Sequence, residues 1–197
     1  MKKLLLPFCL LLAGVVTTNA QGVAIGARAG LNLANQSISS SGVSVSPDSR
    51  LGFFVGAYAK IMVSDKIGVQ PELFYSSVGS KWPDAGSGVQ TIKTDYLTLP
   101  VFFRYNVTDN FHLLAGPQFG ILMSASNKDN SGTSDIKDQL NSSDFSGVVG
   151  AGLDFGPLNA GLRYNFGLSN IEKNAPSGET VKNNVFQIVA GFKLFGK

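Results

Sequence analysis

One histidine and a few carboxylates are the residues of this chain best suited to acid–base chemistry. The histidine is His112, and the groups that could work with it as carboxylate partner or nucleophile are Asp154, Glu72, Ser146 and Ser76. Such catalysis requires the nucleophile and the base to touch. The strand alternation described below places Asp154 near one end of its strand and both serines near the opposite end. We therefore expect no catalytic residues and no enzyme activity, with a lipid-modifying enzyme as the weaker alternative.

A second pattern resembles a calcium-binding loop. Between Asn127 and Asp138, oxygen-bearing side chains fall at positions 1, 3, 5, 9 and 12, and Gly132 falls at position 6, as in a twelve-residue calcium loop. The first residue is Asn, however, and the last is Asp rather than the longer Glu. Loops rich in Asn, Asp, Ser and Gly reach this pattern by chance. We expect a solvated loop, no metal site and no cofactor.

The N-terminus has the features of a secretory signal peptide. Lys2 and Lys3 precede an apolar run over 4–16, and small residues follow at 18–20. The run is too short for a spanning helix, which needs about 20 residues. We predict a signal peptide over 1–20 and one domain over 21–197. Cys9 lies in the predicted signal peptide, so the mature chain would contain no thiol and no disulfide.

Composition excludes several classes of protein. The chain has 197 residues, of which 44% are hydrophobic and 15% charged, which is too apolar for a disordered protein. Without Lys2 and Lys3, its 16 basic residues fall to 14 against 13 acidic ones. This balance gives no reason to expect nucleic acid as a partner. After residue 20 no apolar run approaches 18 residues, so transmembrane helices are not expected.

The mature chain instead shows apolar residues at every second position. From Phe186 to Leu194 the odd-and-even alternation separates an apolar face from a face that contains Gln187 and Lys193. Similar segments recur along the chain, each bounded by turn residues. The eight predicted strands are about 23–33, 50–61, 67–77, 96–107, 111–123, 145–155, 158–168 and 186–194. Their lengths suit tilted strands that cross a bilayer.

Charge is confined to one face of these strands. For each strand we chose the set of alternate positions that makes one face apolar. With that choice, the apolar face of all eight strands carries no charged residue, as a lipid-facing surface requires. A sheet in a membrane must also close, because an open edge would leave backbone groups unpaired in hydrocarbon. A soluble lipocalin-like barrel is the rival architecture, but it would need far more charge on its exterior. The face of the predicted strands opposite the apolar one contains Arg28, Lys60, Glu72, Arg104, Asp154, Arg163 and Lys193.

The connections alternate between short and long. The short ones are 63–66, 108–110 and 156–157, and the long ones are roughly 34–49, 76–95, 124–144 and 169–183. Alternation with an even strand number is typical of outer membrane barrels. The sequence therefore predicts an all-β fold, an eight-stranded antiparallel up-and-down transmembrane β-barrel with short periplasmic turns, long outer loops and both termini at the periplasmic rim.

The seven charged residues of the inner face predict a polar network in the lumen. An eight-stranded barrel is just wide enough to be filled by side chains, and buried charges are normally paired. Five cations against two anions leave three positive charges that need carbonyls, water or exposure at a rim. A narrow anion-favouring channel is the alternative. The large side chains expected to fill the lumen are Phe54, Tyr58, Phe74, Tyr96 and Phe102.

Prolines and a tryptophan carry further local predictions. Pro71, Pro100 and Pro117 lie inside predicted strands, and each removes a donor from the ladder, so we expect bulges or kinks there. Trp82 lies in the second outer loop. A surface aromatic there could anchor a partner or lie at the lipid interface, and the lipid interface is the commoner place.

Several segments resemble the PorT-like outer membrane β-barrel family. They are 26–32, 70–81, 96–101 and 116–117, in the family's order and along essentially the whole mature chain. The resemblance implies a small barrel of the OmpA/OmpX shape, and for most members no assigned activity. One departure is at the C-terminus, where Gly196 and Lys197 follow Phe195, whereas many outer membrane barrels end on an aromatic residue read by the assembly machinery.

These observations together predict a non-enzymatic protein of the cell outer membrane, structural or engaged in surface interactions through its outer loops. The expected partners are outer membrane lipids, the barrel assembly machinery and proteins of the envelope or the cell surface. The PorT-like resemblance supplies an alternative, an accessory factor in protein secretion or envelope assembly. No motif in the loops chooses between these roles.

Overall fold

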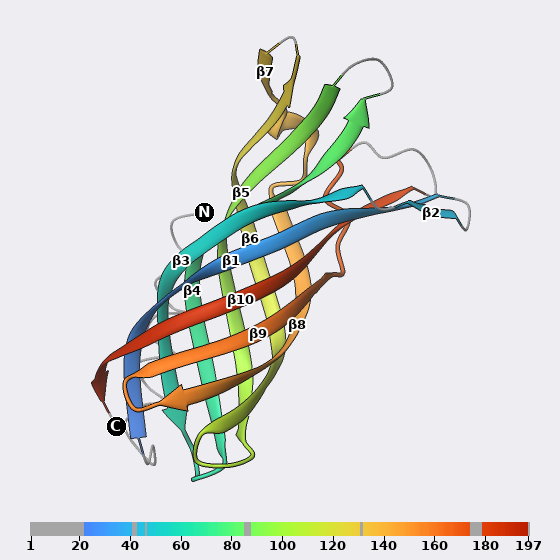
Figure 1. Cartoon of the computed structure of the whole chain (residues 1–197). Coiled ribbons are helices and arrows are strands. Elements are labelled where there is room, and N and C mark those ends of the chain that lie inside the picture. The colour runs from blue at the N-terminus through green and yellow to red at the C-terminus, as the bar shows by residue number, and fades with distance from the viewer. Residues whose placement is uncertain are drawn as a thin grey trace, which may run out of the picture.

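Eight long antiparallel strands close into a ring in the computed structural model (Figure 1). The structure describes residues 22–40, 43–45, 47–84, 88–130, 132–173 and 179–196, so the predicted signal peptide lies outside the described residues. The strands of the ring are β1 (Gly22–Ser40), β3 (Asp48–Met62), β4 (Ile67–Asp84), β5 (Gly88–Asn106), β6 (Phe111–Asp129), β8 (Ser143–Phe155), β9 (Leu158–Gly167) and β10 (Thr180–Gly196). Neighbours in sequence pair with each other, and β10 pairs with β1 to close the ring. This confirms the predicted eight-stranded barrel.

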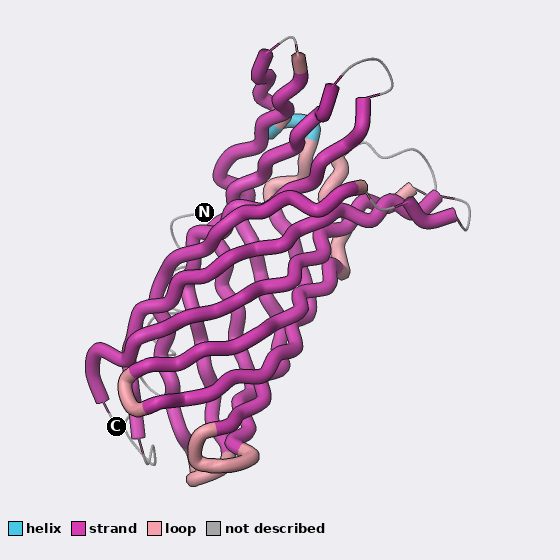
Figure 2. Tube along the Cα trace, viewed as in Figure 1, coloured by secondary structure: helices cyan, strands magenta, loops and turns pink. Residues whose placement is uncertain are grey.

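Three short elements lie at one end of the ring. β2 (Val43–Val45) pairs with β1, β7 (Gly132–Asp135) pairs with β6, and the 3-10 helix η1 (Lys137–Gln139) follows β7. The tube trace shows that strands make up nearly all of the described chain (Figure 2). Within the described residues, no helix is long and apolar enough to cross a membrane.

The two faces of the strands differ as the alternation predicts. Large apolar side chains on the outer face are exposed, among them Leu51 (59%), Phe103 (51%) and Leu162 (51%). The side chains predicted to fill the lumen are buried, and these are Phe54, Tyr58, Phe74, Tyr96 and Phe102. The apolar surface that these exposed side chains form around the ring is far larger than the apolar patches that soluble proteins expose. The inside-out distribution fits a barrel surrounded by lipid and contradicts the soluble lipocalin-like alternative.

Three tight turns join strands at the end of the ring opposite β2 and β7. In the turn between β3 and β4, the Val63 N–H donates to the Ile67 oxygen at 2.8 Å, and the Ile67 N–H donates to Ser64 Oγ at 3.1 Å. The two-residue turn between β8 and β9 contains Gly156 at φ +62°, a conformation that favours glycine. The described ends of β1 and β10 lie at this same end, since Ala24 pairs with Gly196.

The predicted long loops are largely strand. The β4–β5 ladder continues to Asp84 and Gly88, and the β1–β10 ladder continues to Ser39 and Thr180. Figure 1 shows these extensions diverging, with β4, β5 and β7 on one side and β1, β2 and β10 on the other. The alternation missed them because a strand surrounded by water needs no apolar outer face. The boundaries predicted at 76–95 and 34–49 were therefore wrong.

The prolines interrupt the ladders without changing their register. Pro71 still pairs with Val101, and Pro117 with Gly147, in the same register as their neighbours. Register shifts lie elsewhere: between Ile25 and Gly26, Ser49 and Phe54, and Asp95 and Tyr96. The expectation of bulges at the prolines was wrong, because a missing N–H removes one hydrogen bond but requires no extra residue.

Candidate functional site

The carboxylate of Glu72 is the centre of a buried cluster in the lumen. Arg163 binds it in two places, with Nη1 at 2.6 Å from Oε2 and Nη2 at 2.8 Å from Oε1. Arg28 forms a second ion pair with Glu72, and Gln70 Nε2 donates to it at 2.6 Å. These four side chains are at most 3% exposed. One carboxylate on β4 thus stabilises two guanidinium groups, which β1 and β9 bring to it.

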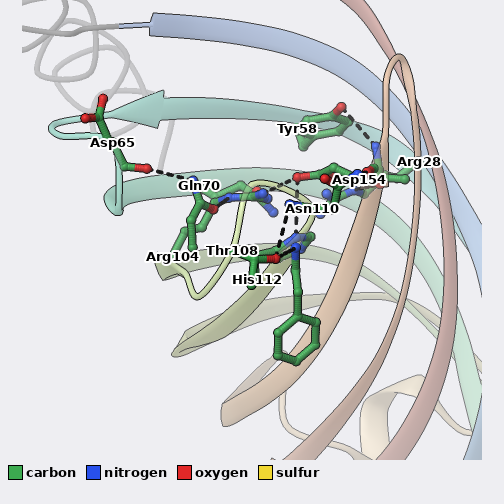
Figure 3. A network of polar contacts seen from close by, with 12 residues as sticks. Arg28, Tyr58, Asp65, Gln70, Arg104, Thr108, Asn110, His112 and Asp154 are labelled. Atoms are coloured by element: carbon green, nitrogen blue, oxygen red, sulfur yellow. Dashed lines mark hydrogen bonds and ion pairs between the residues drawn. The ribbon is translucent and has the colours of Figure 1, made fainter.

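A second cluster is centred on Asp154, nearer the turn end (Figure 3). Arg104 forms an ion pair with its Oδ2, and His112 Nδ1 lies 3.4 Å from the same oxygen. Arg104 Nη1 also donates to Gln70 Oε1 at 3.1 Å, which joins the two clusters. Arg104 Nε donates to Asn106 Oδ1 at 2.9 Å, and Asn106 Nδ2 donates to the backbone oxygen of Asp65 in the adjacent turn.

Aromatic rings lie against the arginines. The guanidinium carbon of Arg28 is 4.2 Å from the ring centroid of Tyr58, and that of Arg163 is 4.7 Å from the ring centroid of Phe102. At these distances the cations are attracted to the ring faces. Asn159 links the first pair, since it accepts from Arg28 Nε at 3.1 Å and donates to the Tyr58 hydroxyl at 3.2 Å. The excess positive charge near Glu72 is therefore partly met by rings and amides.

Lys60 and Lys193 stand apart from these clusters. Both are on the inner face at the turn end, and both are partly exposed. Among the described residues, no salt bridge includes either of them. The structure therefore brings together five of the seven predicted charged residues, Arg28, Glu72, Arg104, Asp154 and Arg163, and leaves the two lysines at the mouth.

Side chains fill the lumen above the clusters. Phe54, Phe74 and Val189 pack together, and Phe102, Leu114 and Val148 form a second apolar group. Two cavities among the lumen side chains are water-sized. One of about 20 Å³ is lined by residues such as Tyr96 and Gln118, and one of about 10 Å³ lies beside Arg28 and His112.

An apolar cluster occupies the lumen at the end opposite the tight turns. Its members come from five strands and are Ala34, Val78, Tyr96, Leu122, Ala125 and Val185. Ile136 and Leu140, which flank η1, pack against this cluster. Backbone hydrogen bonds hold the segment in place: the Ile136 N–H donates to the Ala125 oxygen at 3.1 Å, and the Leu122 N–H donates to the Ser142 oxygen at 2.9 Å. We call residues 136–142 the cap.

Asn32 was not singled out by the sequence, yet it is fully buried and makes several contacts. Its amide donates to the backbone oxygens of Phe53 (3.2 Å) and Ser77 (2.9 Å) and to Ser76 Oγ (3.0 Å). It also accepts from Gln187 Nε2 at 2.9 Å. Tyr58, Asn106 and Asn159 were likewise missed as network members. The alternation could have found all four, because each occupies an inner position of its strand.

The possible catalytic residues do not assemble. His112 lies beside Asp154, but it pairs across the ladder with Gly152, six residues along β8 from Ser146. Six residues of strand span about 20 Å. Ser76 Oγ is bound by Asn32 and Ser146 Oγ by Gln118, the latter at 3.4 Å. Neither serine is within reach of the histidine, so the arrangement supports no acyl transfer.

The calcium-loop pattern folds as a hairpin. Asn127 pairs with Ser134 and Asp129 with Gly132, and the Gly132 N–H donates to Asp129 Oδ1 at 3.1 Å. Ser131 of the pattern lies outside the described residues. A ladder sends alternate side chains to opposite faces, so Asn127 and Asp129 lie on one face of the hairpin, and Thr133 and Asp135 lie on the other. In the part of the chain that the structure describes, no group of three His, Cys, Asp or Glu could hold a metal ion.

Trp82 shares the inner face of β4 with Ser80. It is part of β4, and its Nε1 donates to Ser80 Oγ at 3.1 Å. Ser80 is fully buried on the inner side, and residues two apart on a strand share a face. The segment around Trp82, which was predicted to be a loop, is therefore strand, and Trp82 lies on its inner face.

Comparison with known proteins agrees with this geometry. The family model described as "Outer membrane protein beta-barrel domain" matches residues 19–173. The chain belongs to this family. It is accordingly a protein of the cell outer membrane, and the exposed apolar face of its barrel is the face toward lipid. No curated protein sequence matches the chain.

Solved structures of outer membrane proteins have a similar fold. Neisserial surface protein A is 17% identical, with a TM-score of 0.55, and the match covers 88% of this chain and 100% of that one. Ail of Yersinia pestis is 19% identical, with a TM-score of 0.44, over 88% of this chain and 99% of that one. OprG of Pseudomonas aeruginosa is 14% identical, with a TM-score of 0.45, over 91% and 99%. At 17% identity, the likeness to Neisserial surface protein A concerns the fold alone.

Proposed function

We propose that this family member is a closed barrel that acts through its extracellular surface, as a structural or surface-interaction protein, and has no enzymatic activity. The observation that carries the proposal is the filled lumen. Ion-paired clusters occupy its turn-side half, apolar groups lie above them, and the cap packs on the outer end. The two cavities described among the lumen side chains, of about 20 and 10 Å³, are too small for a substrate.

Conductance in planar bilayers tests whether the barrel is closed. The purified protein should give no discrete current steps at neutral pH in 1 M salt, because paired charges and packed rings block the lumen. Discrete, anion-selective steps would contradict a closed barrel and support the narrow-channel alternative. A protein of the same batch that migrates as folded before heating and as unfolded afterwards is the control for correct insertion.

The extensions of the strands support a role in surface interaction. β4, β5, β6 and β7 together carry a sheet beyond the apolar band, and β1, β2 and β10 carry another. Backbone hydrogen bonds make these extensions firmer than loops, which favours defined binding surfaces. Capture of surface ligands should be lost when the hairpin tip 128–135 is replaced by a short Gly-Ser turn. The matched control is Asp109→Ser, a change in an exposed turn at the opposite end.

An accessory role in secretion or envelope assembly is the second candidate. It rests on the PorT-like segments at 26–32, 70–81, 96–101 and 116–117. Crosslinking followed by a pull-down from detergent extracts distinguishes the two candidates. Periplasmic or secretion-machinery partners retained by the hairpin-replaced variant would favour the accessory role, and partners lost with the hairpin would favour surface interaction.

A further inference from the structure

The turn-side half of the lumen has more positive charge than its own residues neutralise. Arg104 is balanced by Asp154, but Arg28 and Arg163 share the single charge of Glu72. Lys60 and Lys193 add two further cations on the same inner face. Five cationic groups thus face two anionic ones. Buried charges of one sign repel each other and are normally met by a counter-charge.

Lys60 and Lys193 flank one short stretch of β1. Lys60 pairs with Ala24, and Lys193 pairs with Gly26, so the two lysines approach from β3 and β10 on either side of β1. Two strand spacings and an offset of two residues place their Cα atoms roughly 12 Å apart. The inner residues of β1 between them are Ala24 and Gly26, and the ring of Tyr58 lies over Gly26. At a Cα separation of roughly 12 Å, the flexible four-carbon stems can bring both ammonium groups to one ligand.

The surroundings of Lys60 are mostly repulsive. The charged groups that act on it are Arg104, Asp154, Lys193 and Arg28. Asp154 is the one acid among them, and it already binds Arg104. A small anion at the mouth would interact favourably with both lysines and offset the excess charge behind them.

We propose that the turn-side mouth of the lumen, which faces the periplasm, is a binding site for a phosphate-type oxyanion held between Lys60 and Lys193. Three donors on each ammonium group suit a tetrahedral oxyanion bound as a point charge. The same chemistry could come from free phosphate or from the phosphate of an inner-leaflet phospholipid. Chloride, which forms weaker contacts with such donors, should compete poorly.

Amide chemical shifts in zwitterionic micelles test the site with inorganic phosphate as the probe. Titration at constant ionic strength should shift the amides of Ala24, Gly26 and Lys193 along a saturable curve. In the double variant Lys60→Gln/Lys193→Gln the apparent Kd should rise at least about tenfold, because both charges are lost. Lys66→Gln, an exposed lysine in the neighbouring turn, is the matched control and should bind as the unchanged protein does.

Two bilayers distinguish the sources of the phosphate. If the ligand is a headgroup, vesicles of phosphatidylglycerol should reproduce the shifts and vesicles of phosphatidylcholine should not. If it is free phosphate, vesicles of phosphatidylglycerol should leave these amides unshifted until inorganic phosphate is added. Non-saturable shifts, equal binding by the double variant, or equal weakening by Lys66→Gln would each overturn the site. Heat-dependent gel migration shows whether each variant has folded.

Discussion

At the scale of single residues, the charge of Glu72 has the largest predictable consequence. Glu72→Gln keeps the shape of the side chain but leaves Arg28 and Arg163 without their counter-charge in a buried place. Breaking a buried pair in this way costs about 3–5 kcal/mol. We expect the free energy of unfolding in urea, measured in lipid vesicles, to fall by that amount. Asp109→Asn, at an exposed turn residue, should change it little, and an equal loss in both variants would show that Glu72 has no special role.

Residue positions were predictable, but residue partners were not. The alternation placed Glu72, Arg28 and Arg163 on one face because period two requires it. Which of them meet depends on strand tilt and stagger, which connect Glu72 to Arg28 across 44 residues and to Arg163 across 91. No local pattern encodes those separations. The same is true of Lys60 and Lys193, which only the closure of β10 on β1 makes neighbours.

At the scale of elements, the β3–β4 ladder is interrupted and a side chain from a third strand bridges it. Pairing stops at Ser49 and resumes at Phe54, and Asn32 of β1 donates to the backbone oxygens of Phe53 and Ser77 across the gap. Nearby, Arg50 Nη1 donates to the Val78 oxygen at 3.1 Å. Side chains therefore replace missing backbone bonds at one place in the wall.

Asn32→Ala should weaken that place more than the rest of the barrel. Loss of the amide leaves buried backbone oxygens unsatisfied, which costs about 1–3 kcal/mol. Amide hydrogen exchange should become faster for residues 51–53 and 77–79 than for β8 and β9. Asn35→Ala, three residues further along β1, is the control. Uniformly faster exchange throughout the barrel would contradict a local role for Asn32.

The extension of β4, β5 and β6 depends on a carboxylate outside the membrane-spanning segments. Asp95 is buried, which alone would raise its pKa, but hydrogen bonds from Lys93, Ser77 and Ser124 outweigh burial and lower the pKa below its ordinary value of 3.8. A lowered folded-state pKa means that Asp95 contributes stability above pH 3.8. That contribution is lost as the pH falls through the folded-state pKa.

Acidification should therefore loosen this extension in the unchanged protein. We expect exchange of the amides of residues 92–95, corrected for its intrinsic pH dependence, to accelerate as the pH falls below about 4. In Asp95→Asn the same amides should exchange faster at pH 7 and show little further acceleration on acidification. A variant that retains the acid-dependent acceleration would show that another group causes it.

Outside the bilayer, the apolar alternation of the sequence no longer predicts where strands end. Within lipid, a strand must present apolar residues outward, so the eight crossings were visible in the alternation. From Ser76 to Asp84 and from Gly88 to Asp95 the apolar alternation ends, although the ladder between β4 and β5 continues. Backbone hydrogen bonds between adjacent strands extend these elements, and such bonds require no periodic pattern of apolar residues.

At the scale of the whole molecule, the barrel is an inverted protein, with charge inside and apolar side chains outside. Leu162 tests this directly, because it lies midway along β9, is 51% exposed, and pairs with Ala151 and Ile188. Leu162→Arg would place a charge toward the hydrocarbon core. At the midplane such a charge costs about 2–4 kcal/mol. We expect a loss of that size in the free energy of unfolding measured in vesicles.

The matched control is Thr133→Arg, which adds the same side chain on β7, an exposed strand beyond the bilayer. Surface substitutions there should stay within about 0.5 kcal/mol. The difference between the two variants measures the membrane itself, since both add one arginine to a strand surface. In a water-soluble protein, Leu162→Arg would instead be tolerated or would improve solubility. Equal stability of both variants in vesicles would therefore contradict the assignment of this face to lipid and, with it, the orientation of every strand in the ring.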